Sequence, residues 1–144
     1  MEADASDFAL GGCLSQIDPA TRILRPVAFY SRKLIGAEQR YEIYDKEMLA
    51  IYECLMQWRV HLSGAKHKTR IYTDHRNLEY FTTTKVLNKR QARWAENLVE
   101  FNFVVMYRTG ASNTKADLLS RRADYIPKGE EARKPDPPLL RPGQ

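Results

Sequence analysis

Four acidic residues lie in four separate stretches of the chain, each at or near the border of a predicted helix or strand. They are Asp4 in EADASD, Glu47 in YDKEMLAI, Asp74 in RIYTDHRNL and Asp117 in SNTKADLLSR. Carboxylates held within ~4 Å of one another repel by ~4 kcal/mol per pair at an effective dielectric constant of about 20, so an ionised cluster requires divalent cations. If the fold brings these side chains together, the sequence predicts a metal-dependent hydrolytic site. The alternative is that they are scattered surface acids.

The cysteines and histidines do not offer a competing metal site. Cys13 and Cys54 lie far apart without CxxC spacing, which indicates reduced, buried thiols of an intracellular protein. The three histidines, His61, His67 and His75, are not arranged as a zinc ligand set. His75 directly follows Asp74, and we interpret it as a structural or substrate-positioning residue.

Length and charge narrow the class of protein further. At 144 residues, with 43% hydrophobic and 28% charged residues, the chain predicts one globular domain. No apolar run approaches the ~20 residues that cross a bilayer, and no signal peptide is present, so we expect no membrane association and a cytoplasmic location. The net charge is +5, and the charges after residue 122 cancel. The predicted folded body is therefore basic, which is compatible with a polyanionic partner.

The elements that must position the acids follow from hydrophobic periodicity and turn residues. Residues 8–16 and 24–32 predict a hairpin around the turn IDPATR, with Pro26 indicating an edge position or the start of a strand. Apolar side chains at helical spacing predict one amphipathic helix of about five turns over residues 44–62, which carries Glu47. The segment KTRIYTD predicts a strand that ends at Asp74, and HRNLEYF predicts a short helix.

The second half of the chain continues the pattern of helices and strands. Asn88 is the predicted cap of a helix over KRQARWAENLVEF, and FNFVVMYR alternates as a strand does. Ser112 or Asn113 is the predicted cap of a last helix, TKADLLSRR, with Asp117 in its early turns. Together the elements predict an α/β fold with an antiparallel hairpin first and parallel strands later. Five of the seven prolines follow Ile126, so residues 123–144 are predicted to be a disordered tail.

Several segments of the sequence, taken in order, resemble those of one known family. DASDFALGGCLSQ, SRKL, YDKEMLAI, TDHRNLEYF, LNKRQARWAENLVEFNFVVMYRTG and SNTKADLLSRR are similar to the ribonuclease H domain of reverse transcriptases from gypsy-type long-terminal-repeat retrotransposons. The resemblance covers about residues 3–122. It implies a ribonuclease H-like α/β fold, in which a mixed five-stranded sheet has antiparallel strands 1–3 and helices packed on its faces.

The resemblance also implies an activity and a cofactor. Members of the family are endonucleases that hydrolyse the RNA strand of RNA/DNA hybrids, and in the relatives a polymerase belongs to the same polyprotein. The matching positions, Asp4, Glu47, Asp74 and Asp117, are then both catalytic residues and ligands of two magnesium ions, for which manganese can substitute. Two such cations can bind a scissile phosphate from both sides, one activating a water and the other stabilising the leaving 3′ oxygen.

Basic and polar residues near the predicted site are candidates for binding the hybrid. Lys85, Lys89, Arg90 and Arg93 could contact phosphates, which position a duplex without reading its sequence, although a solvated helix face is the alternative for each. Asn77 follows Asp74 by three residues and could reach the minor groove, where 2′-hydroxyls distinguish RNA from DNA.

Two departures from the family pattern leave a second function open. Many ribonucleases H carry a histidine before the last helix, whereas this chain has YRTGASN there. The family's first strand extends several residues upstream of the DAS word, so the domain over residues 1–122 is expected to have a truncated first strand. The alternative hypothesis is therefore a catalytically inactive ribonuclease H-like domain that binds nucleic acid or protein.

Overall fold

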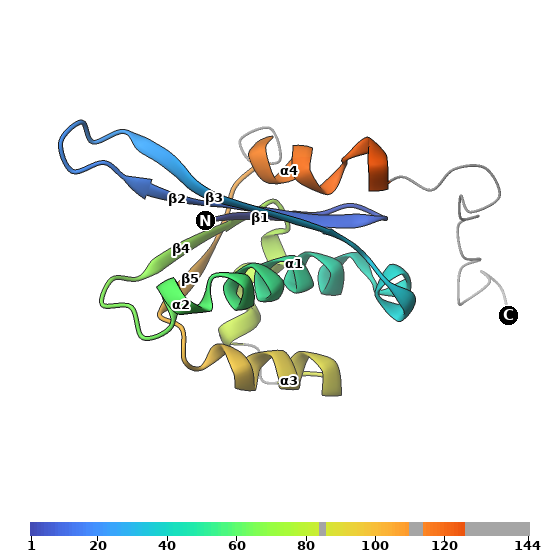
Figure 1. The fold of residues 1–144 in the computed structure, drawn as a ribbon. Helices are drawn as coiled ribbons and strands as arrows, with labels where there is room; N and C mark the ends of the chain where they lie inside the picture. The colour runs from blue at the N-terminus through green and yellow to red at the C-terminus, as the bar shows by residue number, and fades with distance from the viewer. Residues whose placement is uncertain (84–85, 110–113, 126–144) are drawn as a thin grey trace, which may run out of the picture.

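The computed structural model describes residues 1–83, 86–109 and 114–125, which form one sheet with helices on both faces (Figure 1). The strands are β1 (Glu2–Ala5), β2 (Ala9–Ile17), β3 (Leu24–Lys33), β4 (Thr69–Thr73) and β5 (Phe103–Tyr107). The α-helices are α1 (Ile43–Gln57), α2 (Arg59–Leu62), α3 (Lys89–Leu98) and α4 (Thr114–Ser120), and the 3-10 helices are η1 (Gly36–Arg40), η2 (Arg76–Thr83) and η4 (Ala123–Tyr125).

The five strands lie in the order β3-β2-β1-β4-β5. The pairs β1–β2 and β2–β3 are antiparallel, whereas β1–β4 and β4–β5 are parallel. The mixed five-stranded sheet and its antiparallel first three strands are thus confirmed. β1 lies at the centre: it pairs with β2 over Glu2–Ala5, and the Tyr72 amide donates to the Met1 carbonyl at 2.8 Å.

Helices cover the two faces of the sheet unequally. α1 packs on β1 and β2 and α3 lies beyond it, whereas α4 lies across the opposite face on β1 and β2 (Figure 1). Two glycines of β2 permit this close packing. A Cβ at Gly12 would lie 2.2 Å from Cys54 Sγ of α1, and a Cβ at Gly11 would lie 2.6 Å from Leu119 Cβ of α4. Any larger residue at either position would push a helix off the sheet.

Most predicted elements are present, but one helix is divided. The helix predicted over residues 44–62 ends at Gln57, and Trp58 takes φ −107° and ψ 23° before α2 begins. Trp58 and Leu62 are buried in the core while Val60 is almost fully exposed, so the apolar stripe continues into α2 although the helix backbone is interrupted. The prediction of a single helix was therefore wrong. No proline or glycine marks the break in the sequence.

Three smaller differences concern element ends. HRNLEYF lies mostly in a 3-10 helix, η2, rather than an α-helix. α3 ends at Leu98 instead of Phe101, whose backbone forms an isolated bridge with Ser63. Ala123–Tyr125 forms a 3-10 turn, so regular structure continues past residue 122; Ser112, Asn113 and residues 126–144 lie outside the described residues.

The hairpin and the cysteines agree with their predictions. β2 and β3 pair in register as far as a bulge between Leu14 and Ser15, and Pro26 lies on the edge strand as expected. Cys13 and Cys54 are free and buried.

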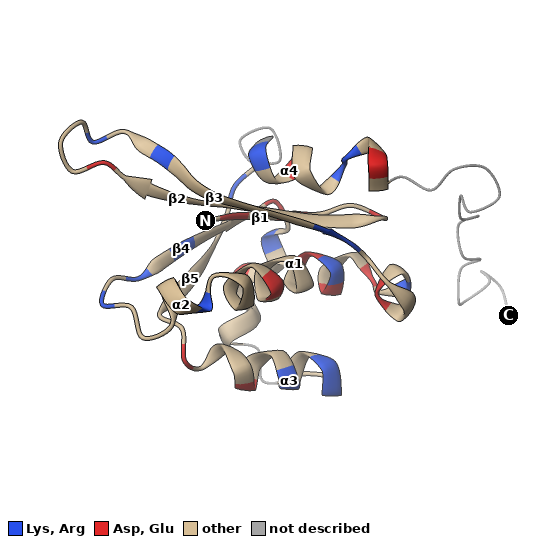
Figure 2. Cartoon of the chain, viewed as in Figure 1, with Lys and Arg blue, Asp and Glu red and all other residues tan. Residues whose placement is uncertain are grey.

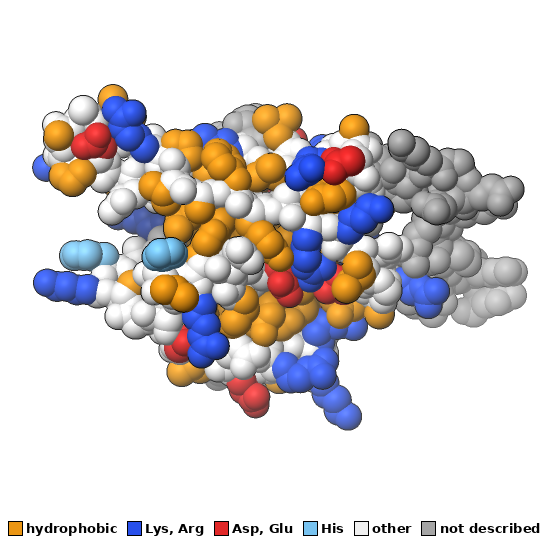
Figure 3. All heavy atoms as spheres, viewed as in Figure 1, with side chains coloured by type: hydrophobic (Ala, Val, Ile, Leu, Met, Phe, Trp, Pro, Cys, Tyr) orange, Lys and Arg blue, Asp and Glu red, His pale blue; other side chains and the backbone are white. Residues whose placement is uncertain are grey.

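Along the β3 edge, Leu24, Val27 and Phe29 expose more than half of their surface, and hydrophobic side chains gather on this side (Figure 3). No helix among the described residues is long and apolar enough to cross a membrane.

Candidate metal and catalytic centre

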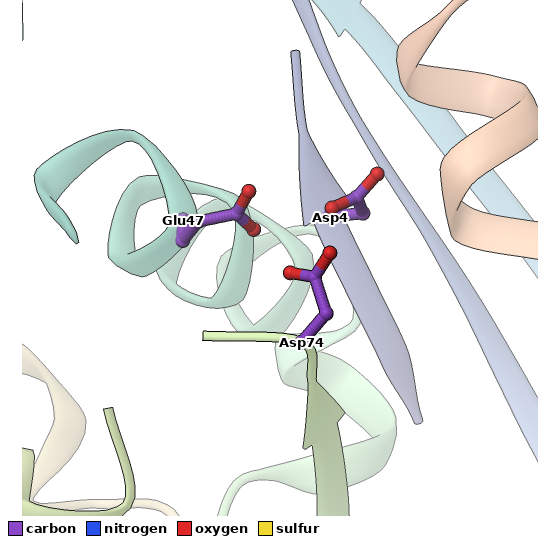
Figure 4. Close-up of side chains that lie close together, drawn as sticks. All are labelled: Asp4, Glu47 and Asp74. Atoms are coloured by element: carbon purple, nitrogen blue, oxygen red, sulfur yellow. The ribbon is translucent and has the colours of Figure 1, made fainter. Parts of the chain in front are cut away.

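Three of the four predicted acids converge at one edge of the sheet. One carboxylate oxygen from each of Asp4, Glu47 and Asp74 lies within 4.8 Å of the other two. Asp4 comes from β1, Glu47 from α1, and Asp74 directly follows β4, and the three side chains point toward one another (Figure 4). Residues separated by up to 70 positions in the chain therefore form one site.

The topology explains this convergence. β1 and β4 are parallel neighbours, so the residues at their carboxyl ends meet at the same edge of the sheet. α1 crosses β1 near its start, which brings Glu47 to that edge, and the Ala5 amide donates to Glu47 Oε2 at 3.1 Å. That bond fixes the helix carboxylate against the central strand.

Two of the three carboxylates are buried beside like charges. Asp4 and Glu47 are 3% and 4% exposed, whereas Asp74 is exposed. Burial, followed by the charges of Asp4 and Asp74, raises the pKa of Glu47 to about 10. Burial and the charge of Asp74 raise the pKa of Asp4 to about 6. In the described part of the chain none of the three forms an ion pair with Lys or Arg, so the protein supplies no cation that directly neutralises them.

Two serines that the sequence interpretation missed hold Asp4 in place. The Ser120 hydroxyl lies 2.9 Å from Asp4 Oδ2 and is 1% exposed, and this hydrogen bond lowers the pKa of Asp4. The Ser6 hydroxyl in turn donates to the Ser120 carbonyl oxygen at 2.5 Å. Neither Ser120 nor Ser6 carries a distinctive sequence signal, because the role of both depends on α4 lying over β1.

Ser120→Ala tests this contact and should destabilise the protein more at pH 8 than at pH 5. Hydrogen bonds to charged groups contribute about 1.5–3 kcal/mol, and Asp4, with a pKa of about 6, carries its charge mainly above that pH. Chemical denaturation at both pH values measures the effect.

The matched control is Ser31→Ala, because the Ser31 hydroxyl bonds the Leu119 carbonyl at 2.8 Å and anchors α4 without touching Asp4. Its cost should be equal at the two pH values. Equal costs for Ser120→Ala as well would show that Ser120 only anchors the helix.

Asp117 does not join the three converging carboxylates. Its charge and a side-chain hydrogen bond with Asp4 contribute to raising the pKa of Asp4, yet it is not one of the three residues whose oxygens all lie within 4.8 Å of one another. Asp117 Oδ1 also accepts from Arg121 Nε at 2.8 Å, and Arg121 is the residue directly after α4. The structure therefore places Asp117 beside the site, with its side chain held by a cation one turn away.

The candidate nucleic-acid-binding residues differ in exposure and in their contacts. Asn77 is exposed in η2, and Lys89 and Arg93 are exposed on α3 (Figure 2). Arg90 is already engaged: its guanidinium pairs with Asp45 at 2.7 Å and lies 3.6 Å from the centroid of the Tyr41 ring. Lys85 lies outside the described residues.

The start of α3 is fixed against α1 by side-chain hydrogen bonds. The Asn88 side chain caps the helix by accepting from the Gln91 amide at 2.8 Å, as predicted. Gln91 also donates to Asp45 Oδ1 at 2.8 Å, and Asp45 lies two residues before Glu47 on α1. Residues two positions apart project from different sides of a helix, so this contact ties α3 to α1 without placing it next to the Glu47 carboxylate.

The donor set fits a hard divalent cation. The three converging residues offer only carboxylate oxygens, which are the ligands preferred by magnesium and manganese. Two of them are buried with no ion pair to Lys or Arg within the described ranges, and a bound cation would offset the burial and the mutual repulsion that raise their pKa values. His75 packs edge-on against Tyr44, with ring centroids 5.5 Å apart, which favours a structural role for it.

Sequence comparison relates the chain to reverse transcriptases. Residues 1–101 match the family described as the RNase H-like domain found in reverse transcriptase. The Tf2-3 and Tf2-4 transposon polyproteins of Schizosaccharomyces pombe are each 43% identical over 136 residues, which is 91% of this chain. The chain spans 10% of the length of these relatives.

Solved structures share the fold at low sequence identity. LC11-RNase H1 in complex with an RNA/DNA hybrid superposes with a TM-score of 0.62 at 15% identity, over 82% of this chain and 90% of that one. The foamy viral protease-reverse transcriptase in complex with RNA/DNA hybrid gives a TM-score of 0.56 at 16% identity, over 93% of this chain and 17% of that one. These similarities concern the fold.

Proposed function

Since the chain belongs to the family of RNase H-like domains found in reverse transcriptases, we propose that it hydrolyses the RNA strand of RNA/DNA hybrids. The observation that carries the proposal is the convergence of Asp4, Glu47 and Asp74 within 4.8 Å at one edge of the sheet. The two solved structures above were each determined with an RNA/DNA hybrid, which supports this choice of substrate. We further propose a gypsy-type retrotransposon polyprotein as the source, with a polymerase in the same polyprotein, and a cytoplasmic location.

In this proposal Asp4, Glu47, Asp74 and Asp117 hold two magnesium ions, which manganese can replace. When bound, these cations supply an activated water and stabilise the charge that develops on the leaving 3′ oxygen. The chain's own part is to hold the ligands rigidly. The Ala5 amide of β1 fixes the buried Glu47 carboxylate, and the Ser120 hydroxyl of α4 fixes the buried Asp4 carboxylate. The exposed Asp74 leaves the site open to a phosphate.

Substrate binding is proposed to use the basic residues of α3 and the polar start of η2. Lys89 and Arg93 present exposed cations for phosphates. Lys85, which lies outside the described residues, and the paired Arg90 complete the proposed set. Asn77 is exposed three residues after Asp74, where it can donate to or accept from a 2′-hydroxyl.

The direct test is magnesium-dependent cleavage of a labelled RNA/DNA hybrid by the purified chain, with the matching DNA/DNA duplex as control. Cleavage of the hybrid alone supports the proposal. Hybrid binding without cleavage at any magnesium or manganese concentration would instead support the inactive binding domain. The observation that favours this second function is the Asp117–Arg121 pair, which leaves three rather than four acids together.

Replacing Lys89 and Arg93 together by Ala should weaken hybrid binding without regard to sequence. The loss of up to about two phosphate contacts should flatten the dependence of log K on log salt by up to ~2, while single-turnover cleavage at saturating enzyme stays near that of the wild type. Fluorescence anisotropy over a range of salt concentrations measures both the affinity and the slope.

Lys66→Ala combined with Lys68→Ala is the matched control. These exposed lysines precede β4, at the opposite end of that strand from Asp74, so the same charge is removed far from the site (Figure 2). If both double variants change the slope equally, the hybrid responds to net charge and α3 is not its binding surface.

A further inference from the structure

The Asp117 side chain pairs with the cation that directly follows its helix. Arg121 Nε lies 2.8 Å from Asp117 Oδ1 in an i,i+4 pair, with side chains 64% and 43% exposed. Arg121 also interacts electrostatically with other nearby acids. Its pKa is raised first by the hydrogen bond and charge of Asp117 and further by the charges of Asp4 and Asp7. Among the described residues it is the arginine that pairs with a member of the proposed ligand set.

The helix that carries this pair cannot move toward the site. Its backbone packs directly on Gly11, where an added Cβ would lie 2.9 Å from the Ala116 carbonyl oxygen and 2.8 Å from the Ser120 nitrogen. The Ser31 and Ser6 hydroxyls bond the last carbonyl groups of α4 at 2.8 and 2.5 Å. In this fixed position the Asp117 carboxylate has two neighbours: Asp4, with which it shares a side-chain hydrogen bond, and Arg121.

Arg122, the next residue, behaves differently. It pairs with Asp124 at 2.7 Å, outside the acidic edge, and both side chains are exposed. The two neighbouring arginines therefore carry the same charge at almost the same place in the chain, but only Arg121 contacts a proposed ligand.

We propose that Arg121 is the resident counterion of Asp117 and competes with the divalent cation for this carboxylate. Asp117 then completes the site only when Arg121 releases it, so Arg121 sets the cation concentration at which four ligands are available. This inference rests on the proposed function, because it takes Asp4, Glu47 and Asp74 to be the remaining ligands. Arg121 is a positioning residue that acts through Asp117.

Cation affinity measured without substrate tests the proposal. In isothermal titration calorimetry with magnesium or manganese, Arg121→Gln should bind about threefold more tightly than the wild type, because competition from an exposed ion pair is worth a small factor. The gain should be larger at ~20 mM than at ~200 mM monovalent salt. Arg122→Gln, which removes the same charge, should leave the affinity unchanged. An equal gain in both variants, or none in Arg121→Gln, overturns the proposal.

A double-mutant cycle with Asp117→Asn separates this mechanism from a general field effect. In the Asp117→Asn background, Arg121→Gln should change the cation affinity by less than about half of its effect in the wild-type background. The reason is that no Asp117 carboxylate remains for Arg121 and the cation to compete for. A full gain in that background would show that Arg121 acts on the other acids directly, and would refute the proposal. Asp74→Asn separates failure of the Arg121 inference from failure of the proposed metal site. If Asp74→Asn does not weaken cation binding, the proposed metal site is wrong, regardless of the result for Arg121.

Discussion

Asp74→Asn should reduce magnesium-supported cleavage of an RNA/DNA hybrid by about a thousandfold or more while leaving the fold intact. The substitution keeps the size of the side chain but removes one anionic oxygen from the three that lie within 4.8 Å of one another. Asp74 is exposed, so its amide replacement buries no new polar group. Losing its charge also relieves repulsion on Asp4 and Glu47, so the metal-free variant should melt at the same temperature as the wild type or higher.

Single-turnover cleavage of a labelled hybrid, with thermal unfolding in EDTA, measures both parts of this expectation. Asp7→Asn is the matched control: Asp7 lies three residues after Asp4, its side chain is 80% exposed, and it pairs with Lys46 at 3.7 Å outside the converging trio. This variant should retain nearly full activity. Retained cleavage in Asp74→Asn at unchanged magnesium would show that the carboxylate trio is not the catalytic centre.

The sequence predicted those parts of the fold that depend on local patterns. Alternating residues and the Asp-Pro turn predicted the β2–β3 hairpin, and Asn88 predicted the start of α3, where its side chain accepts the capping hydrogen bond. The convergence of Asp4, Glu47 and Asp74 was predictable in outline, because parallel strands β1 and β4 bring their carboxyl ends to one edge.

Features that depend on packing between distant elements were not predictable in this way. The break at Trp58 has no local signal, and the helical spacing of apolar residues continues across it. The hydrogen bond between Ser120 and Asp4 joins residues 116 positions apart and exists only because Gly11 lets α4 lie close on β2. Similarly, the sequence places Asp117 on the right helix, but its contacts with both Asp4 and Arg121 depend on side-chain conformation.

The buried carboxylates also predict that the metal-free protein becomes less stable as the pH rises from 5 to 9. The folded-state pKa values of Asp4 and Glu47, about 6 and about 10, lie above the ordinary values of 3.8 and 4.5. Between these limits the folded state binds more protons than the unfolded state, so the free energy of unfolding falls with pH. The Asp4 contribution is lost by about pH 6, and the Glu47 contribution continues to fall toward pH 10. We expect a total loss on the order of a few kcal/mol between pH 5 and 9. Carboxylates with lowered pKa values, such as Glu38 beside Arg32, act in the opposite direction only at lower pH.

Glu47→Gln should remove most of this slope, because the neutral amide can remain buried at pH 9 and can still accept the hydrogen bond from the Ala5 amide. Urea denaturation at several pH values in EDTA should therefore show the variant gaining stability over the wild type as the pH rises. Glu96→Gln, an exposed position on α3, is the control and should reproduce the wild-type slope. Adding magnesium at pH 8 should restore stability to the wild type more than to Glu47→Gln, since binding to the folded state alone stabilises it and the variant lacks one ligand. A slope that Glu47→Gln leaves unchanged would mean that the pH dependence arises elsewhere and that Glu47 is not held as an uncompensated acid.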